Sequence, residues 1–190
     1  MPRTNTADRL LDEAERLVRT RGFNAFSYRD LAAAIDIRTA SIHYHFPTKA
    51  DLGLALVTRY RQRLQEALAD IDRESASPKA RVQRFVQIYR EAAESGDQIC
   101  LCGSLASDAS TLPEPLREAV GAYFDESVDW VAGVFADGEA AHAWPPLVDP
   151  HATASLVVSA LQGALLHARL IRNQAPVTAA GEFIERLLGG

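Results

Sequence analysis

Polar side chains between residues 38 and 43 carry donors and acceptors that could bind the edges of DNA bases. They are Arg38, Thr39, Ser41 and His43, of which Thr39 and Ser41 are expected to read bases. Apolar residues of the same stretch recur at a helical spacing that would turn them toward a protein core: Ile37, Ile42 and Phe46. A short helix with this pattern could enter the major groove, where each base pair presents its own set of donors and acceptors.

A second group of residues, at expected helix ends, could hold the phosphates of the DNA backbone. Hydroxyls, an ammonium group and free backbone N–H groups suit phosphate oxygens, and the residues that offer them are Ser27, Tyr28, Tyr44 and Lys49. Packing is the alternative for Tyr44 and the favoured interpretation for His45, whereas Lys49 could be a solvated first-turn residue. Arg3 and Arg9 belong either to a disordered basic arm or to an arm that contacts DNA.

Capping signals in residues 5–51 predict three helices and the start of a fourth. The first is expected from about residue 5 to residue 21, where Gly22 would supply a left-handed stop. Ser27 and Asp30 form an acidic variant of the capping box and open a second helix, which extends through residue 34. Asp36 tolerates the left-handed backbone of a tight turn, and a third helix follows over residues 38–45 until Pro47.

The rest of the chain shows helical apolar spacing and no strand-like alternation. Proline and capping signals predict helices over about residues 49–73 and 78–96, from Pro113 to just before Trp144, and over 149–172, with a last amphipathic helix near the C-terminus. The expected fold class is all-α, with an N-terminal three-helix helix-turn-helix domain and a C-terminal helical domain.

The helix expected at residues 149–172 is apolar around nearly its whole axis, so one buried face does not account for it. Small residues would let another helix approach closely: Ser159, Ala160, Gly163 and Ala164. The last helix offers further apolar residues beside it: Phe183, Ile184, Leu187 and Leu188. A symmetric four-helix interface between two copies of the chain would bury both faces.

The segment from residue 22 to residue 52 resembles the DNA-binding domain of the TetR/AcrR family of transcriptional repressors. The matching residues are Gly22-Phe23, residues 27–32 (SYRDLA), Ile37, residues 41–47 (SIHYHFP) and residues 48–52 (TKADL). The resemblance is close over the first quarter of the chain and loose beyond it. Residues 35–37 lack the small residue or glycine frequent in the turn, Ala40 replaces a frequent glycine, and His43 replaces a common tyrosine; these departures bear on base preference.

The resemblance implies a DNA-binding domain in residues 1–48 and an effector-binding and dimerisation domain in residues 49–190. It implies a homodimer on an inverted-repeat operator in double-stranded DNA, with a small-molecule effector that releases the repressor. Candidates to line an apolar effector pocket are Tyr89, Cys102, Ser104, Tyr123, Phe124, Trp130, Phe135, Leu161 and His167. Residues of these types, taken singly, belong more often to an ordinary core than to a pocket.

The two cysteines, Cys100 and Cys102, suggest an alternative function on the same scaffold. A reactive thiolate there would sense electrophiles or oxidants by covalent modification. Against this stands the simpler interpretation of two inert thiols, because no basic residue lies nearby in sequence to favour a thiolate. Their one-residue separation points the side chains apart and disfavours a disulfide between them.

Charge is distributed unevenly along the chain, which fits contact with a polyanion at one end. The overall formal charge is −5, but residues 1–64 carry a net +4 and residues 65–190 a net −9. A basic N-terminal third on an acidic body permits phosphate contact at that third. A helical adaptor that binds only protein would leave this basic third unexplained.

Other classes of protein find little support in the sequence. It lacks the motifs of nucleophile-elbow hydrolases, zinc proteases, phosphate-binding loops and dinucleotide-binding folds, so no enzymatic activity and no cofactor are expected. His142, His151 and His167 are too scattered to predict a metal site. The N-terminus lacks an apolar targeting segment and no long uninterrupted apolar run follows, so the expected location is the cytoplasm without membrane contact.

Overall fold

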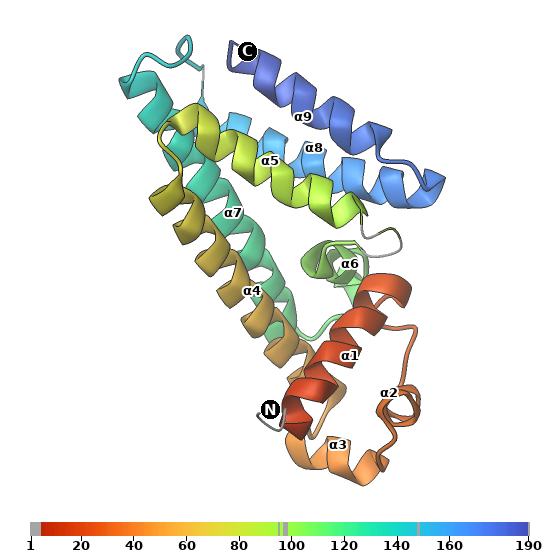
Figure 1. Cartoon of the computed structure of the whole chain (residues 1–190). Coiled ribbons are helices and arrows are strands. Elements are labelled where there is room, and N and C mark those ends of the chain that lie inside the picture. The colour runs from red at the N-terminus through yellow and green to blue at the C-terminus, as the bar shows by residue number, and fades with distance from the viewer. Residues whose placement is uncertain (1–4, 95, 97–98, 148, 190) are drawn as a thin grey trace. The chain divides into compact units, whose positions relative to one another are not determined.

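The computed structural model describes residues 5–94, 96, 99–147 and 149–189, and within these ranges the regular structure is entirely helical (Figure 1). The predicted all-α fold class is thereby confirmed. The helices are α1 (Thr6–Arg21), α2 (Tyr28–Ile35), α3 (Thr39–His45), α4 (Lys49–Glu74), α5 (Pro78–Glu94), α6 (Leu101–Ser107), the 3₁₀ turn η1 (Ala109–Thr111), α7 (Glu114–Ala140), α8 (Pro150–Ile171) and α9 (Ala175–Leu187).

The chain forms two compact units that do not follow the order of the sequence. The first comprises Met1–Gln62 with Leu101–Ala122, and the second comprises Arg63–Cys100 with Tyr123–Gly190. Helices α4 and α7 each contribute to both units. The segment that contains α6 belongs to the first unit, although no signal in the sequence separates it from the C-terminal domain.

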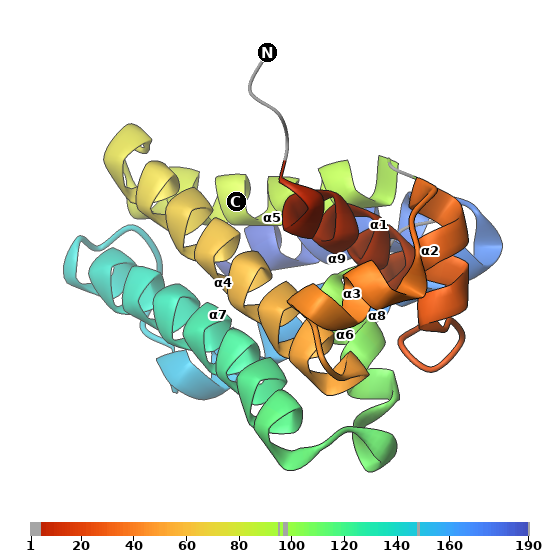
Figure 2. The same cartoon turned by 90° about the horizontal axis from the view of Figure 1, so that it is seen from below.

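In the first unit, α1 packs against α2 and α6, and α2 packs against α3 (Figure 2). The buried face of α1 is the apolar stripe that its helical spacing predicts, and it includes Leu10, Leu17 and Val18. Helix α6 lies against α1 at the level of Val18, because the hydroxyl of Ser104 donates a hydrogen bond of 2.8 Å to the Val18 carbonyl. Most of α6 is buried, and its short length leaves only a weak periodic signal in the sequence.

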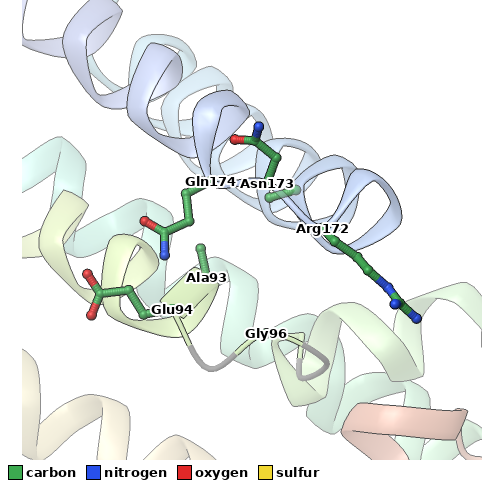
Figure 3. Close-up of a pocket in the computed structure, with 7 residues that line it drawn as sticks. Ala93, Glu94, Gly96, Arg172, Asn173 and Gln174 are labelled. Carbon is green, nitrogen blue, oxygen red and sulfur yellow. The ribbon is translucent and has the colours of Figure 1, made fainter.

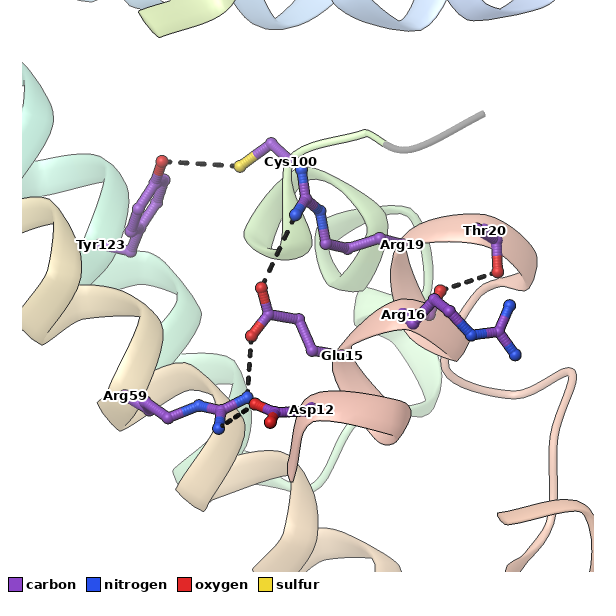
Figure 4. A network of polar contacts seen from close by, with 8 residues as sticks. All are labelled: Asp12, Glu15, Arg16, Arg19, Thr20, Arg59, Cys100 and Tyr123. Atoms are coloured by element: carbon purple, nitrogen blue, oxygen red, sulfur yellow. Dashed lines mark hydrogen bonds and ion pairs between the residues drawn. The ribbon is translucent and has the colours of Figure 1, made fainter. Parts of the chain in front are cut away.

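Ion pairs join α1 to α4 in the same unit (Figure 4). The guanidinium of Arg59 on α4 lies 2.7 Å from the carboxylate of Asp12 and 3.0 Å from that of Glu15. Glu15 is buried, and a second cation, Arg19, lies 3.6 Å from it. A buried carboxylate needs such partners, since its isolated charge would be costly away from water.

In the second unit, α5, α8 and α9 lie side by side (Figure 1). Gly181 on α9 permits this close approach, because a Cβ there would lie 2.7 Å from atoms of Arg90 and of Val86 on α5. An aromatic cluster extends the core toward α7: the ring centroid of Phe85 lies 5.6 Å from both Tyr89 and Trp130. Offset contacts of this kind stabilise a core beyond the area that they bury.

The outer face of α8 remains exposed, although the helix is long and apolar. Its inner face is buried through Val157, Leu161 and Leu165, whereas Leu156 and Leu170 are 71% and 81% exposed. By length and composition alone α8 is long and apolar enough to cross a membrane. Of its most apolar window, 33% is buried within the chain. On α9 and its C-cap the predicted apolar residues divide in the same way: Ile184 and Leu188 are buried, and Phe183 and Leu187 are exposed.

Candidate DNA-binding surface

Helix α3 divides into a buried and an exposed side, as the sequence predicts. Ile42 is fully buried and Phe46, which follows the helix, is nearly so. On the other side, Arg38 and His43 are exposed, Thr39 and Ser41 are partly exposed, and Tyr44 is 83% exposed. Within the described ranges the side chains of Arg38, Thr39 and Ser41 have no hydrogen-bond partner, so their donors and acceptors are available to a ligand.

The imidazole of His43 is oriented by the turn that follows α3. Its Nδ1 lies 3.1 Å from the carbonyl oxygen of Pro47, and its ring packs edge-on against Tyr28 at 4.9 Å between centroids. A carbonyl oxygen only accepts hydrogen bonds, so Nδ1 carries the proton in this contact. In the neutral ring, Nε2 is then an acceptor.

Tyr28 directs its hydroxyl inward, toward the turn between α3 and α4. The oxygen lies 2.9 Å from the Phe46 carbonyl and 2.6 Å from the Thr48 carbonyl, and its single proton donates there. Burial, with the nearby charge of Asp51, raises the pKa of Tyr28 to about 12. The hydroxyl therefore connects α2 with the start of α4, and its proton is already used in the DNA-free protein.

Ser27 forms the predicted capping box with Asp30. Its side chain accepts a hydrogen bond from the Asp30 amide, and the Asp30 carboxylate accepts from the Ser27 amide at 2.7 Å and from its hydroxyl at 2.6 Å. These bonds hold the pKa of Asp30 below its usual value. Asp36 has the predicted left-handed backbone, with φ 55° and ψ 57°. Gly22 differs from the expected left-handed stop: its φ of 96° is positive, but its ψ of 157° is extended.

Lys49 is half-buried, and its ammonium group is bonded within the first unit. It donates hydrogen bonds of 2.5 Å to the carbonyl oxygens of Phe23 and Phe26, and it lies 4.8 Å and 4.4 Å from the centroids of their rings. Burial lowers the pKa of Lys49, while the nearby charges of Asp108 and Asp30 act in the opposite direction. Two of its three N–H bonds are therefore used within the protein.

The two arginines considered for a basic arm have different outcomes. Arg9 belongs to α1, and its guanidinium donates a 3.0 Å hydrogen bond to the carbonyl of Ile35 at the end of α2. It therefore joins two helices of the first unit instead of extending from a disordered arm. Arg3 lies outside the described residues.

Asp108 is a residue near this surface that sequence reasoning missed. Its carboxylate accepts hydrogen bonds from the backbone amides of Phe23 and Asn24, at 3.2 Å and 3.4 Å. The side-chain amide of Asn24 also donates to the hydroxyl of Thr111 at 2.8 Å. These contacts join residues more than 80 positions apart, so no local pattern in the sequence could have indicated them.

The residues expected to line an effector pocket lie in both units. Cys102 and Ser104 belong to α6 in the first unit, and Ser104 is engaged with Val18. The other residues belong to the second unit, where Tyr89, Tyr123, Phe135 and Leu161 are buried. Tyr89 accepts a hydrogen bond from Gln162 on α8 at 3.2 Å, and Trp130 donates one to Asp72 on α4 at 2.9 Å. His167 is exposed on the outer face of α8.

One surface hollow of the second unit has a volume of about 390 Å³ (Figure 3). It lies where the end of α5 meets the turn between α8 and α9, and its lining is largely polar: Ala93, Glu94, Gly96, Ala168, Arg172, Asn173 and Gln174. None of the predicted effector residues lines this hollow.

Both cysteines are buried. The sulfur of Cys100 lies 3.5 Å from the hydroxyl of Tyr123, a contact within the second unit (Figure 4). Burial shields a thiol from reagents in solution. The structure therefore does not favour the thiol-sensor alternative.

A capped helix pair whose second helix presents unpaired polar side chains is the form of a helix-turn-helix DNA-binding protein. The match to known families agrees. Residues 10–56 match the family model of bacterial regulatory proteins of the tetR family, and residues 78–184 match the tetracyclin repressor-like C-terminal domain. The chain belongs to the TetR/AcrR family and is a DNA-binding transcriptional regulator, as the sequence motifs predicted.

Solved structures of family members are similar over the whole chain. A TetR transcriptional regulator from Legionella pneumophila is 34% identical, with a TM-score of 0.88 and coverage of 99% of this chain and 100% of that one. A TetR-family regulator from Agrobacterium tumefaciens is 30% identical, with a TM-score of 0.92 and 96% of each chain covered. The HTH-type transcriptional repressor DhaR of Mycobacterium sp. (strain GP1) is 22% identical over 93% of this chain and 89% of its own length.

Proposed function

We propose that this regulator is a repressor that binds an inverted-repeat operator and is released by a small-molecule effector. The observation that carries the proposal is the set of unpaired polar side chains on α3, namely Arg38, Thr39 and Ser41, above a buried Ile42. Such a helix fits the major groove, with Thr39 and Ser41 toward base edges and Arg38 toward base or phosphate. The name of DhaR, a transcriptional repressor, supports the same direction of regulation.

We propose that the chain forms a homodimer through α8 and α9, and a twofold dimer of this kind requires an inverted repeat in its operator. An exposed seam runs along α8 at helical spacing, and its members are Leu156, Ala160, Gly163, His167 and Leu170. Phe183 and Leu187 on α9 expose further apolar area. A second copy related by a twofold axis would cover the seam and place two α3 helices on equivalent half-sites.

We propose that the effector binds in the second unit, at the aromatic cluster of Phe85, Tyr89 and Trp130. The contact between Gln162 and the Tyr89 hydroxyl places polar groups beside buried aromatic rings, the composition expected of a small-molecule site. Residues 1–48 and 49–190 would then be the DNA-binding and effector domains in the functional sense. A regulator of this kind works in the cytoplasm.

A gel-shift assay on DNA from upstream of the chain's own gene tests the repressor proposal. Binding should require an inverted repeat, should weaken steeply with added salt, and should be lost in a duplex with scrambled half-sites. A thermal-shift screen of metabolites then tests the effector, since a ligand at a hundred times its Kd adds about 2.7 kcal/mol to stability. Hits that stabilise the protein without releasing the DNA would count against the effector proposal.

A further inference from the structure

The loop between α1 and α2, residues 22–27, is held by charges of opposite sign. Asp108 accepts hydrogen bonds from the amides of Phe23 and Asn24. Lys49 donates to the carbonyls of Phe23 and Phe26. Phe23 is thus bonded at both its N–H and its C=O, with the carboxylate at the donor and the ammonium at the acceptor. Each charge is matched to the end of the peptide dipole that favours it.

The apolar part of the loop reinforces this arrangement. The rings of Phe23 and Phe26 are buried, meet edge to face at 6.3 Å, and both lie within reach of the Lys49 ammonium. A cation at this distance from an aromatic ring is attracted by it, most strongly where water is excluded. Gly22, with its positive φ, turns the chain into the loop, a conformation that other residues rarely adopt.

The loop leads directly into the proposed DNA-binding surface. Its last residue, Ser27, is the N-cap of α2, and Tyr28 then bonds to the turn that ends α3. A displaced loop would therefore shift the start of α2 relative to α3, and the polar side of α3 would no longer match the groove. Hydrogen bonds to charged groups are stronger than those between neutral groups. The loss of either the Lys49 or the Asp108 charge should therefore displace the loop enough to weaken DNA binding by α3.

We propose that Lys49 and Asp108 are positioning residues for DNA binding, which fix the loop of residues 22–27 and through it the α2–α3 pair. This inference rests on the proposed DNA-binding role of α3, and it gives Lys49 a different task from the phosphate contact that its position in the sequence suggested. It also assigns to DNA binding an acidic residue, which by its charge alone would repel DNA.

Salt dependence of binding distinguishes the two roles of Lys49. A lysine that contacts phosphate releases a counterion on binding. Its loss therefore reduces the magnitude of the negative slope of log K against log salt by about 0.9 per contact, or about 1.8 for the two subunits of a dimer. We expect Lys49→Met, which keeps most of the apolar stem, to weaken binding to the upstream duplex at least roughly tenfold with that slope unchanged, since each subunit loses two charge-assisted hydrogen bonds. A slope whose magnitude falls by about one charge per subunit would overturn the inference.

The sign of the effect at Asp108 provides an independent test. Removing a carboxylate from a DNA-binding surface raises affinity if only its charge matters, because repulsion of phosphate is relieved. The positioning role predicts the reverse: Asp108→Ala should weaken binding, and Asp108→Asn, whose amide oxygen still accepts a hydrogen bond, should weaken it less. Unchanged or tighter binding by Asp108→Ala would refute the proposed role.

Local and global effects of these variants can be separated. Hydrogen exchange at the amides of Phe23 and Asn24 should accelerate in Asp108→Ala, while the amides of α8 keep wild-type protection. If Lys49→Met does not fold, Lys49→Gln replaces it, since its amide still donates to a carbonyl while the charge is removed, and the salt slope should again equal that of the wild type. Wild-type protein that fails to bind the upstream duplex would instead contradict the repressor proposal.

Discussion

At the scale of single residues, Tyr28 makes stability depend on pH in the alkaline range. Its pKa is raised from 10.0 to about 12, so the folded state holds the phenol proton more tightly than the unfolded chain does. The stabilisation is complete below pH 10 and is lost as the pH rises through about 12. Between these values, the free energy of unfolding should fall more steeply in the wild type than in Tyr28→Phe.

Urea denaturation followed by circular dichroism at several pH values measures this difference. Tyr28→Phe keeps the ring against His43 and loses only the hydroxyl, so every other titrating group is common to the two proteins. At neutral pH the variant should be less stable by about 1 kcal/mol, the usual net value of a hydrogen bond. Parallel curves for the two proteins from pH 10 to pH 12 would show that the Tyr28 proton is not held in this way.

Ser41 carries a prediction about base preference. Its hydroxyl lies on the partly exposed side of α3 with no partner in the described part of the chain, so it is free to bind a base edge. Ser41→Ala should relax the preference at one base pair of each half-site, a change of about 1–3 kcal/mol in discrimination, and leave the salt slope unaltered.

Selection from a randomised duplex library measures the base preference of the Ser41→Ala protein. Ser75→Ala is the matched control, since Ser75 is also partly exposed but lies in the second unit, after the end of α4. The control should select the same sequences as the wild type. An equal loss of affinity on all sequences in Ser41→Ala would contradict the assignment.

At the scale of elements, two glycines on α7 should respond in opposite ways to the same substitution. A Cβ at Gly138 would overlap the ring of Trp144, which is itself buried and packed edge-on against Phe135. A Cβ at Gly133 meets no atom within 4 Å. Gly133→Ala should stabilise the protein by about 0.5–1 kcal/mol through helix propensity, whereas Gly138→Ala should destabilise it by about 1–3 kcal/mol through overpacking.

Thermal unfolding of the two variants against the wild type is sufficient to test this pair. Because both glycines belong to the same helix and unit, the propensity gain is shared, and the difference isolates the contact with Trp144. A Gly138→Ala protein as stable as Gly133→Ala would mean that Trp144 is not seated on the helix.

The elements were predictable where the signal is local. Asn5, Ser27 and Asp149 cap α1, α2 and α8 through their own side chains, and a cap is recognised from residues only a few positions apart. Helix α6 and the contacts of Asp108 were not predictable, because seven residues show too little periodicity and the partners are distant in sequence. For the same reason, the motif singled out Lys49 but could not show that its ammonium group donates to the carbonyls of Phe23 and Phe26.

At the scale of the whole molecule, the exposed seam on α8 predicts that dimerisation and operator binding are lost together. Gly163 lies within the seam, and a Cβ there meets nothing within 4 Å of the single chain. An arginine at this position is therefore tolerated by the isolated fold, but in a dimer it would bury an unpaired charge between two α8 helices. Gly163→Arg should weaken the dimer roughly hundredfold and reduce affinity for the inverted repeat more than for a single half-site.

Gly133→Arg is the matched control, since Gly133 is also exposed and open but lies on α7 outside the seam. Light scattering coupled to size exclusion gives the oligomeric state, and fluorescence anisotropy on full and half-site duplexes gives the two affinities. Because the two half-sites are bound by one rigid pair of α3 helices only when the seam is closed, the loss of cooperativity should track the fraction of monomer across protein concentrations. A Gly163→Arg protein that remains dimeric at the concentrations where the wild type is dimeric would place the interface on another face.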